Sequence, residues 1–402
     1  MNESSILAVV PRVPWPPRRS GFSVRYFPLL RHLSASHAVD LVVVGDRDAW
    51  GEPNPFAGAR ETTYVDVSGR SPSLRARLGT LARGLVPAGA PYAMRSVWTG
   101  EVVRAVRAAA RRREYDVMLW AGPEYFEAAL LLAQQRPARR CVYDLVDSPS
   151  MIATRARSEA QDPREVDAIR RWENRLRECA DLTIYISDAD ARASQPPDAA
   201  RRTLVLPNGI YLDDLGDATR ALPRPAGLAP RYALFFGHMS FGPNVDAAGW
   251  LANDIMPAVR ACEPGLQLVI AGHQPAPQVQ ALASADTLVT GSVESIWPYV
   301  GNAAVCIFPL RLAAGLQNKV LEALAMGKAV VTTRQCAAAV GAESGVHLLA
   351  ADTREEIVAA STRLLADAAL ARRLGDAGRE LVLRRFDWAA LNRQFETALL
   401  GR

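Results

Sequence analysis

Two lysines stand close together in the stretch GLQNKVLEALAMGK, residues 315–328, of a chain whose other 45 basic residues are all arginine. Gly315 lies in an expected loop, and the apolar residues that follow Lys319 have helical spacing, so Lys319 falls in the first turn of a helix. Free N–H groups at a helix start attract anions, but a lysine there is unfavourable unless an anion is bound. We therefore interpret Lys319 as a ligand of a diphosphate.

Glu322 lies three residues further on, on roughly the same helical face as Lys319. A carboxylate at this place can accept hydrogen bonds from sugar hydroxyls, as acidic residues do for ribose in dinucleotide-binding folds. An ordinary surface Lys–Glu pair is the alternative, and it would serve equally well with arginine, the usual cation of this chain. Lys328 has no comparable function in this interpretation.

Short apolar runs alternate with longer amphipathic stretches along the whole chain. This alternation predicts parallel sheets covered by helices on both faces. The expected strands are residues 6–10, 39–44, 116–120, 141–146, 182–187, 203–207, 232–236, 266–271, 287–290, 304–309 and 329–333. Glycine at 327 suits the left-handed position that ends the helix after Lys319.

The alternation pauses once, in the Pro/Ala/Gly-rich residues 216–231, which have the composition of a linker. We expect an α/β protein with a doubly wound, Rossmann-like N-terminal domain at 1–215 and a second such domain at 232–386. Ligands bind outside the carboxyl ends of such strands, so two facing domains would form an interdomain cleft. Residues 387–402 include an amphipathic helix that could pack back on the first domain.

The composition, 49% hydrophobic and 22% charged, is typical of a globular protein without membrane-spanning segments. Five scattered cysteines without C-x-x-C spacing disfavour disulfides or zinc, and no secretory signal opens the chain, so we expect a cytoplasmic protein. Residues 70–113 hold ten arginines and one acid. This basic stretch is either a solvated face or a contact for an anionic membrane surface. No nucleic-acid-binding motif accompanies it, so we expect no nucleic-acid partner.

Several segments together resemble the GT-B glycosyltransferases of the glycosyltransferase family 4 type, in particular bacterial sugar transferases of exopolysaccharide clusters. The resemblance starts at RVPWPPRRSGFSVRYFPLLRHLSASHAVDLVVV and continues through LVLPNGIYLDDL to FFGHMSFGPNVDAAGWLANDIMPAVR. It ends with LQLVIAGHQP and TGSVESIWPYVGNAAVCIFPLRLAAGLQNKVLEALAMG. It covers most of the chain and implies a GT-B fold, with an acceptor-binding first domain and a nucleotide-sugar-binding second domain.

The resemblance implies an enzyme of the hexosyltransferase type, active in polysaccharide biosynthesis. It would move a sugar from a UDP- or GDP-type nucleotide sugar to a hydroxyl of a glycan, lipid-linked or small-molecule acceptor. It implies retention of configuration, no further cofactor and no metal, and the lipid-linked acceptor would favour peripheral association with the inner membrane face. The donor-binding residues it implies are Gly21, Gly237, His238, Asn244, Ser292, Val293, Arg311, Gly315, Leu316, Asn318, Lys319 and Glu322.

Two departures from the family pattern affect the donor site. Many relatives carry a glutamate where this chain has Ala314, which puts the contacts of the transferred sugar in question. Many also carry arginine and lysine after the first strand of the second domain, where this chain has GHMSFGPNVD. Phosphate charge must then be met by Lys319, Arg311 and helix N-termini, which would stabilise the leaving diphosphate.

A carboxylate of the first domain is expected beside the acceptor. Asp144 and Asp147 lie near the carboxyl end of the strand expected at 141–146, and we choose Asp147 as a catalytic residue together with Lys319 and Glu322. Capping of the next helix by Asp147 or Ser148 is an equally good interpretation.

Alternative functions stay open at this point. A sugar-nucleotide epimerase of the same fold would bind the same donor, and a degenerate transferase would bind it without turnover. The D-x-D tripeptides at 46–48 and 188–190 could suggest a metal-dependent transferase. We interpret the first as a loop and the second as a helix start, with Ser187 as its cap and Asp190 at the third helical position.

Overall fold

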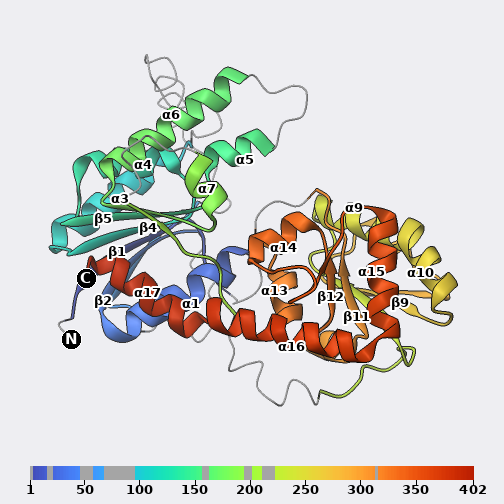
Figure 1. The fold of residues 1–402 in the computed structure, drawn as a ribbon. Coiled ribbons are helices and arrows are strands. Elements are labelled where there is room, and N and C mark those ends of the chain that lie inside the picture. The colour runs from blue at the N-terminus through green and yellow to red at the C-terminus, as the bar shows by residue number, and fades with distance from the viewer. Residues whose placement is uncertain are drawn as a thin grey trace. The chain divides into compact units, whose positions relative to one another are not determined.

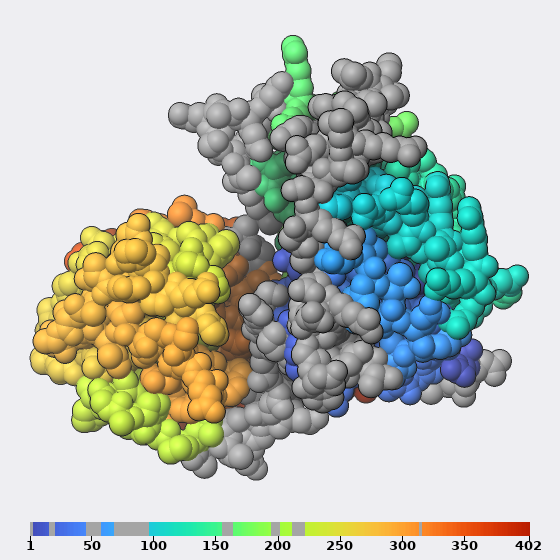
Figure 2. Space-filling model, turned by 180° about the vertical axis from the view of Figure 1, so that it is seen from behind, coloured from blue at the N-terminus to red at the C-terminus, as the bar shows by residue number. Residues whose placement is uncertain are grey.

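The computed structural model describes residues 3–15, 21–45, 58–67, 96–155, 163–193, 202–210, 222–312 and 316–402; the others are grey in Figures 1 and 2. The chain divides into two compact units. The first comprises Met1–Asn208 together with Ala390–Arg402, and the second comprises Gly209–Ala389. In Figure 2 the colours run from blue to green in the first unit and from yellow to orange in most of the second.

The first unit contains a parallel sheet whose described strands lie in the order β3-β2-β1-β4-β5-β6-β7. They are β1 (Ser5–Val10), β2 (Ala38–Val44), β3 (Glu61–Val65), β4 (Val117–Ala121), β5 (Arg140–Val146), β6 (Leu182–Tyr185) and β7 (Thr203–Val205). The central strands are almost fully buried because their side chains are apolar on both faces. The strand order reverses between β1 and β4, which makes their carboxyl ends the switch point where such sheets bind ligands.

Helices cover both faces of this sheet (Figure 1). On one face lie α3 (Thr99–Arg112), α4 (Phe126–Gln135) and α6 (Pro163–Cys179), and on the other lie α1 (Gly21–Ser36) and the part of α17 (Trp388–Leu400) that belongs to this unit. The short helices α5 (Pro149–Arg155) and α7 (Asp188–Ala193) follow β5 and β6. Apolar residues of α3, α4 and α6 form a continuous core with one face of the strands.

The C-terminal helix α17 is held in the first unit by polar contacts as well as by its apolar face. Glu396 contacts His32 Nε2 at 2.7 Å and His37 Nε2 at 3.0 Å. Arg140 donates hydrogen bonds to the backbone oxygens of Leu399 and Ala398, both at 3.1 Å. The last turn of α17 is therefore tied to the amino end of β5.

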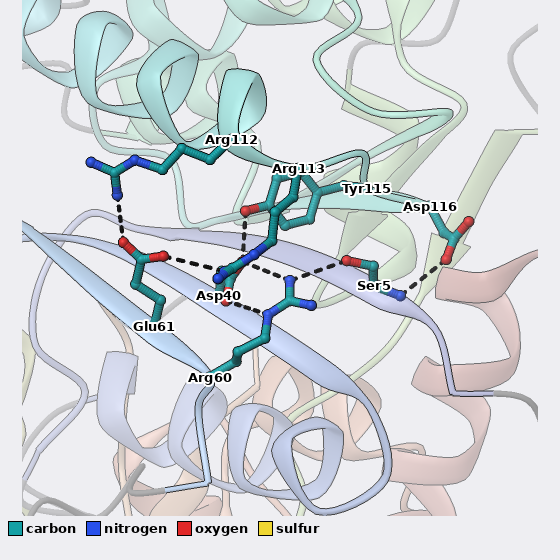
Figure 3. A network of polar contacts seen from close by, with 8 residues as sticks. All are labelled: Ser5, Asp40, Arg60, Glu61, Arg112, Arg113, Tyr115 and Asp116. Atoms are coloured by element: carbon teal, nitrogen blue, oxygen red, sulfur yellow. Dashed lines mark hydrogen bonds and ion pairs between the residues drawn. The ribbon is translucent and has the colours of Figure 1, made fainter.

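A network of charged side chains lies at the amino ends of β2, β3 and β4, at the edge of the sheet opposite to the switch point (Figure 3). The buried carboxylate of Asp40 accepts hydrogen bonds from Arg60 at 2.9 and 2.7 Å, from Arg113 at 2.8 Å and from the Tyr115 hydroxyl at 2.6 Å. Burial raises the pKa of Asp40, but these hydrogen bonds outweigh burial and lower it. Burial, with Asp40 beside it, raises the pKa of Tyr115 to about 12. One arginine of the basic stretch, Arg113, thus has a structural partner.

The second unit repeats this topology in a parallel sheet whose described strands lie in the order β10-β9-β8-β11-β12-β13. They are β8 (Tyr232–Phe236), β9 (Gln267–Ala271), β10 (Thr287–Gly291), β11 (Val305–Phe308), β12 (Val330–Thr332) and β13 (Leu349–Ala350). Here the order reverses between β8 and β11, so the switch point lies where these two strands end.

The helices of the second unit are α9 (Gly242–Trp250), α10 (Met256–Cys262), α11 (Pro277–Gln280), α12 (Trp297–Asn302), α13 (Asn318–Ala325), α14 (Arg334–Val340), α15 (Arg354–Ala366) and α16 (Ala368–Arg385). A π-helical turn at Leu251–Ile255 joins α9 to α10. α16 packs directly on the turn after α13, because a Cβ at Gly375 would lie 2.2 Å from the Gly327 oxygen. This close approach fixes the end of the helix that carries Lys319.

The expected α/β architecture of two doubly wound sheets is confirmed. Each of the eleven expected strands is present, with ends that differ by at most two residues, whereas β3 and β13 were not expected. The expected linker, residues 216–231, lies partly outside the described residues, and its described part, 222–231, contains no helix or strand. Among the described residues, no helix is both long and apolar enough to cross a membrane.

Candidate functional site

The carboxyl ends of β8 and β11 bring together the segments that the sequence marks as donor-binding. β8 leads into Gly237, and β11 leads through Pro309 into the loop before α13. α13 begins at Asn318 and buries Val320, Leu321 and Leu324 in the core. It ends at Ala325, and Gly327, two residues further on, has a φ of +65°, the left-handed conformation predicted for this glycine.

Lys319 lies in the first turn of α13, with only 9% of its surface exposed. Its ammonium donates a hydrogen bond of 2.6 Å to Asn244 Oδ1 and a longer one of 3.5 Å to Gln317 Oε1. Both acceptors are neutral amide oxygens. Burial lowers the pKa of Lys319 to about 8, and the nearby Cys336 and Glu322 offset only part of that effect. The site therefore holds a desolvated cation at a helix N-terminus.

Glycines make room for this ammonium. Gly237 has a φ of +152°, and a Cβ there would lie 3.0 Å from Lys319 Cε and 3.1 Å from Asn244 Nδ2. Gly272, at the end of β9, lies against it, since its Cβ would come within 1.8 Å of the Gly237 oxygen. Asn244 Nδ2 donates to the His238 backbone oxygen at 2.9 Å, which turns Oδ1 toward the lysine. The end of β8 is thus shaped around Lys319.

The other residues predicted to bind the donor lie in several places. Asn318 and the partly buried Glu322 share α13 with Lys319, and Leu316 precedes it. His238 is exposed, with Nδ1 3.1 Å from the Ser240 hydroxyl. Ser292 and Val293 follow β10, and Ser292 Oγ lies 3.0 Å from Nδ1 of His273. Gly315, like Ala314 beside it, lies outside the described residues.

Arg311, predicted as a phosphate ligand, already has an anionic partner. Its guanidinium makes two hydrogen bonds of 2.8 Å to the carboxylate of Asp246, on α9. It also lies over the Trp250 ring, 4.8 Å from the centroid. This arrangement fixes the guanidinium against α9.

Lys328 has a structural function that the sequence did not reveal. Its ammonium donates a hydrogen bond of 2.9 Å to the backbone oxygen of Gly301, near the end of α12. A cation beside the last carbonyl groups of a helix is favourable. The two lysines of one short stretch therefore have different environments.

In the first unit, Asp144 is fully buried and binds Arg25, which is also buried. The guanidinium contacts the two carboxylate oxygens at 2.7 and 2.9 Å, and it donates to the Leu206 oxygen at 2.8 Å and to Asn208 Oδ1 at 3.3 Å. Burial lowers the pKa of Arg25, but the charges and hydrogen bonds of Asp144 and Tyr26 together outweigh burial and raise it. The position of Arg25 between the apolar residues Val24 and Tyr26 of α1 is the signal that could have predicted this pair.

Asp147, the predicted catalytic carboxylate, is partly buried just beyond the end of β5. It follows Val146, whose φ of +62° is a strained conformation for a β-branched residue. The adjacent Ser148 caps α5, since its hydroxyl accepts from the Met151 N–H at 3.3 Å. Of the two capping candidates, Ser148 makes this bond. Gly21, at the start of α1, is exposed, and an added Cβ there would have no neighbour within 4 Å among the described residues.

The structure describes only the second of the two D-x-D tripeptides. Residues 46–48 lie outside the described residues. At the second tripeptide, the Ser187 hydroxyl accepts a hydrogen bond of 3.2 Å from the Asp190 N–H at the start of α7, so the predicted helix cap is confirmed.

The family described as glycosyl transferases group 1 matches residues 230–367, which form most of the second unit. Solved structures of low identity have the fold of the whole chain. Sucrose-phosphate synthase from Thermosynechococcus elongatus is 19% identical, with 98% of each chain covered and a TM-score of 0.69. HepE of Anabaena in complex with UDP is 16% identical, with 99% of this chain and 100% of that chain covered and a TM-score of 0.67.

A glycosyltransferase from Rickettsia africae is 12% identical and has a TM-score of 0.69, with 99% of this chain and 98% of that chain covered. A comparison with curated protein sequences gives no match. The chain has the GT-B fold of glycosyltransferases, as the resemblance implied.

Proposed function

We propose that this protein is a glycosyltransferase that moves a sugar from a nucleoside diphosphate sugar to an acceptor hydroxyl. The observation that carries the proposal is the buried ammonium of Lys319, which lies at the N-terminus of α13 and is solvated by amide oxygens. Removal of a cation from water is costly unless an anion is bound beside it. A diphosphate at the switch point of the second unit supplies that anion.

The helix start strengthens the argument for an anion. The N–H groups of the first turn of α13 and its dipole favour negative charge at the same end of the helix. The family match over residues 230–367 supports a sugar donor, and HepE of Anabaena has been solved with UDP and with UDP-glucose. A UDP- or GDP-type nucleotide sugar is the donor we propose.

The proposed chemistry is dissociation of the sugar–phosphate bond with the diphosphate as leaving group. Lys319 and the N–H groups of α13 stabilise the negative charge that the diphosphate gains in the transition state. Glu322 accepts hydrogen bonds from the ribose. Because Arg311 is paired with Asp246, Lys319 is the principal cation for the diphosphate. Retention of configuration and independence from a divalent metal are part of the proposal.

The test is a thermal-shift series of the protein with UDP, GDP, TDP, ADP and their common sugars, with and without EDTA. A ligand that binds the folded state raises the unfolding temperature. We expect one nucleotide to give a selective shift that survives EDTA. The Lys319→Ala variant should lose the shift, whereas Lys328→Ala should keep it because that lysine contacts Gly301 instead. Failure of every nucleotide to shift the wild type would contradict the proposal.

We further propose that the protein works at the cytoplasmic side of a membrane, through its arginine-rich residues 70–113. Most of this stretch lies outside the described residues, and in α3 the exposed Arg104 is 4.0 Å from Glu101, a weak surface pair. Flotation with anionic liposomes tests the proposal. We expect co-flotation at low salt that is lost at high salt, and its absence at low salt would contradict it.

A further inference from the structure

The ammonium of Lys319 is buried against neutral groups and not against a carboxylate. Within the described residues, its two hydrogen bonds go to the side-chain amide oxygens of Asn244, at 2.6 Å, and Gln317, at 3.5 Å. Buried cations are usually paired with an acidic side chain, because an isolated charge inside a protein costs free energy. An asparagine in contact with this lysine solvates the charge but does not neutralise it. At neutral pH the ammonium therefore stays available to an anion from outside the protein.

The backbone determines which end of the Asn244 amide faces the lysine. Asn244 is 3% exposed, and its Nδ2 donates a hydrogen bond of 2.9 Å to the His238 backbone oxygen. A backbone carbonyl can only accept, so Nδ2 points toward it and Oδ1 toward Lys319 Nζ. A Cβ at Gly237 would lie 3.1 Å from Asn244 Nδ2 and 3.0 Å from Lys319 Cε, so the glycine leaves room for both side chains.

Two titratable groups act on Lys319 besides its burial, Cys336 on α14 and Glu322 on α13. Burial is the largest effect and lowers the pKa of Lys319 to about 8, while these two groups raise it only in part. Burial also raises the pKa of Cys336, which keeps it a neutral thiol at pH 7. A carboxylate in direct contact with Nζ would supply the missing compensation in the free protein, and the chain has an amide at that place.

We propose that Asn244 is a positioning residue that holds Lys319 in place for the diphosphate, and that it must be neutral to do so. The diphosphate rests on the proposed function, whereas the neutral pairing of the two side chains does not. A carboxylate at position 244 would bind the ammonium in the free protein and compete with the ligand for it. It would also bring negative charge close to the diphosphate. The second unit thus has a less stable free state, in which the ammonium remains available to a ligand.

The substitution Asn244→Asp tests this proposal by thermal unfolding without ligand between pH 7 and 10.5. The wild-type unfolding temperature should rise over this range, because the lysine loses its proton more readily in the folded than in the unfolded state. Asn244→Asp should lose most of the rise, since the new carboxylate favours the charged lysine. A merely structural defect would lower the unfolding temperature at every pH and leave the rise unchanged.

The second measurement is the affinity for UDP or GDP at pH 7, whichever the wild type binds. We expect it to be at least tenfold weaker in Asn244→Asp. Asn302→Asp is the matched control, because the Asn302 amide also donates to backbone oxygens, of Pro298 at 2.9 Å and Leu222 at 3.3 Å, and is not a partner of Lys319. Asn302→Asp should keep both the rise with pH and the wild-type affinity.

A folded Asn244→Asp variant with the wild-type affinity, or with the wild-type rise with pH, would overturn the proposal. Should this variant fail to fold, Gln317→Glu carries the same expectations, because its side chain is only partly buried and an acid is favourable at the start of α13. Failure of the wild type to bind any nucleotide would contradict the proposed function alone. The pH profiles would then still test the pairing of Asn244 with Lys319.

Discussion

Lys319 and Lys328 show how far residue types alone could predict the site. The scarcity of lysine singled out both, and the position of Lys319 in a helix predicted that it, and not Lys328, binds an anion. The amide oxygens that solvate it come from Gln317, two residues away, and from Asn244, 75 residues away. The resemblance supplied Asn244, but nothing in the sequence indicated Gln317. The capping contact of Lys328 depends on Gly301, 27 residues away, and could not be predicted for the same reason.

Replacement of Lys319 by methionine should stabilise the ligand-free protein while it abolishes nucleotide binding. The lysine has a pKa of about 8 when folded and an ordinary value of 10.5. Between pH 8 and 10.5 the unfolded state binds more protons at this lysine than the folded state does. The free energy of unfolding of the wild type should therefore rise with pH over this range, by about 3 kcal/mol in total. Lys319→Met should lack this rise and be more stable below pH 8.

Thermal unfolding of both proteins between pH 7 and 10.5 measures the effect. A wild type that gains no stability relative to Lys319→Met over this range would contradict the burial of a charged lysine.

Substitution of the glycines at the end of β8 and β9 should have graded effects. Gly272→Ala places a Cβ 1.8 Å from a backbone oxygen and should strongly destabilise the protein. Gly237→Ala meets flexible side-chain atoms at 3.0 and 3.1 Å, so it should fold with a smaller loss and bind nucleotide more weakly. Gly242→Ala, whose Cβ meets none of the described residues within 4 Å, is the control. Thermal unfolding and nucleotide titration would check this order, and equal effects at 237 and 242 would contradict it.

At the scale of elements, apolar runs predicted the buried strands, and the two strands that the sequence analysis missed are at sheet edges. β3 has a single buried residue and begins with three polar residues, while β13 is only two residues long. Neither gives the continuous apolar run that marks a central strand. The same limit applies to the turn after β4, whose unusual φ values have no signature in the sequence.

The buried pair of Arg25 and Asp144 should hold together α1, β5 and the segment after β7. Asp144→Asn leaves Arg25 without its counterion and should cost roughly 3 to 5 kcal/mol of stability. The double variant Arg25→Met with Asp144→Leu removes both charges and should recover a large part of that loss. Chemical denaturation of the wild type and both variants gives the comparison. A double variant that is no more stable than Asp144→Asn would show that the unpaired charge of Arg25 is not the cause of the lost stability.

The contact of α17 with α1 should weaken in acid. Burial raises the pKa of Glu396, but the hydrogen bonds from His32 and His37 outweigh burial and lower it below its ordinary 4.5. The carboxylate therefore contributes stability above pH 4.5, which is lost as the pH falls through the lowered folded value. Glu396→Gln should remove this contribution.

Unfolding temperatures of the wild type and Glu396→Gln between pH 3 and 7 check the prediction, with Glu380→Gln on the exposed face of α16 as control. A difference between wild type and Glu396→Gln that does not shrink in acid would contradict the contact.

At the scale of the whole molecule, two units of the same topology each have charged side chains near the carboxyl ends of their central strands. The second unit has a buried lysine and glycines there, and the first has the pair of Arg12 and Glu124. Alternation of strands and helices was enough to predict both sheets, because parallel strands need helical connections. It could not identify which side chains lie at the ends of these strands. Lysine scarcity and family resemblance pointed to those of the second unit, whereas the pair in the first is seen only in the structure.

The central claim, that Lys319 binds the diphosphate, is tested most directly by calorimetric titration at pH 9. The ligand is UDP or GDP, whichever gives the larger thermal shift. The titration is run in two buffers of different ionisation enthalpy, so that proton uptake can be measured. Lys319 has a pKa of about 8 in the free protein. A bound diphosphate favours the charged lysine, so binding at pH 9 should take up close to one proton, and much less at pH 7. Lys319→Met, which should not bind the nucleotide, is the control and should give no heat of binding in either buffer. Nucleotide binding without proton uptake at pH 9 would contradict the assignment of Lys319 to the diphosphate.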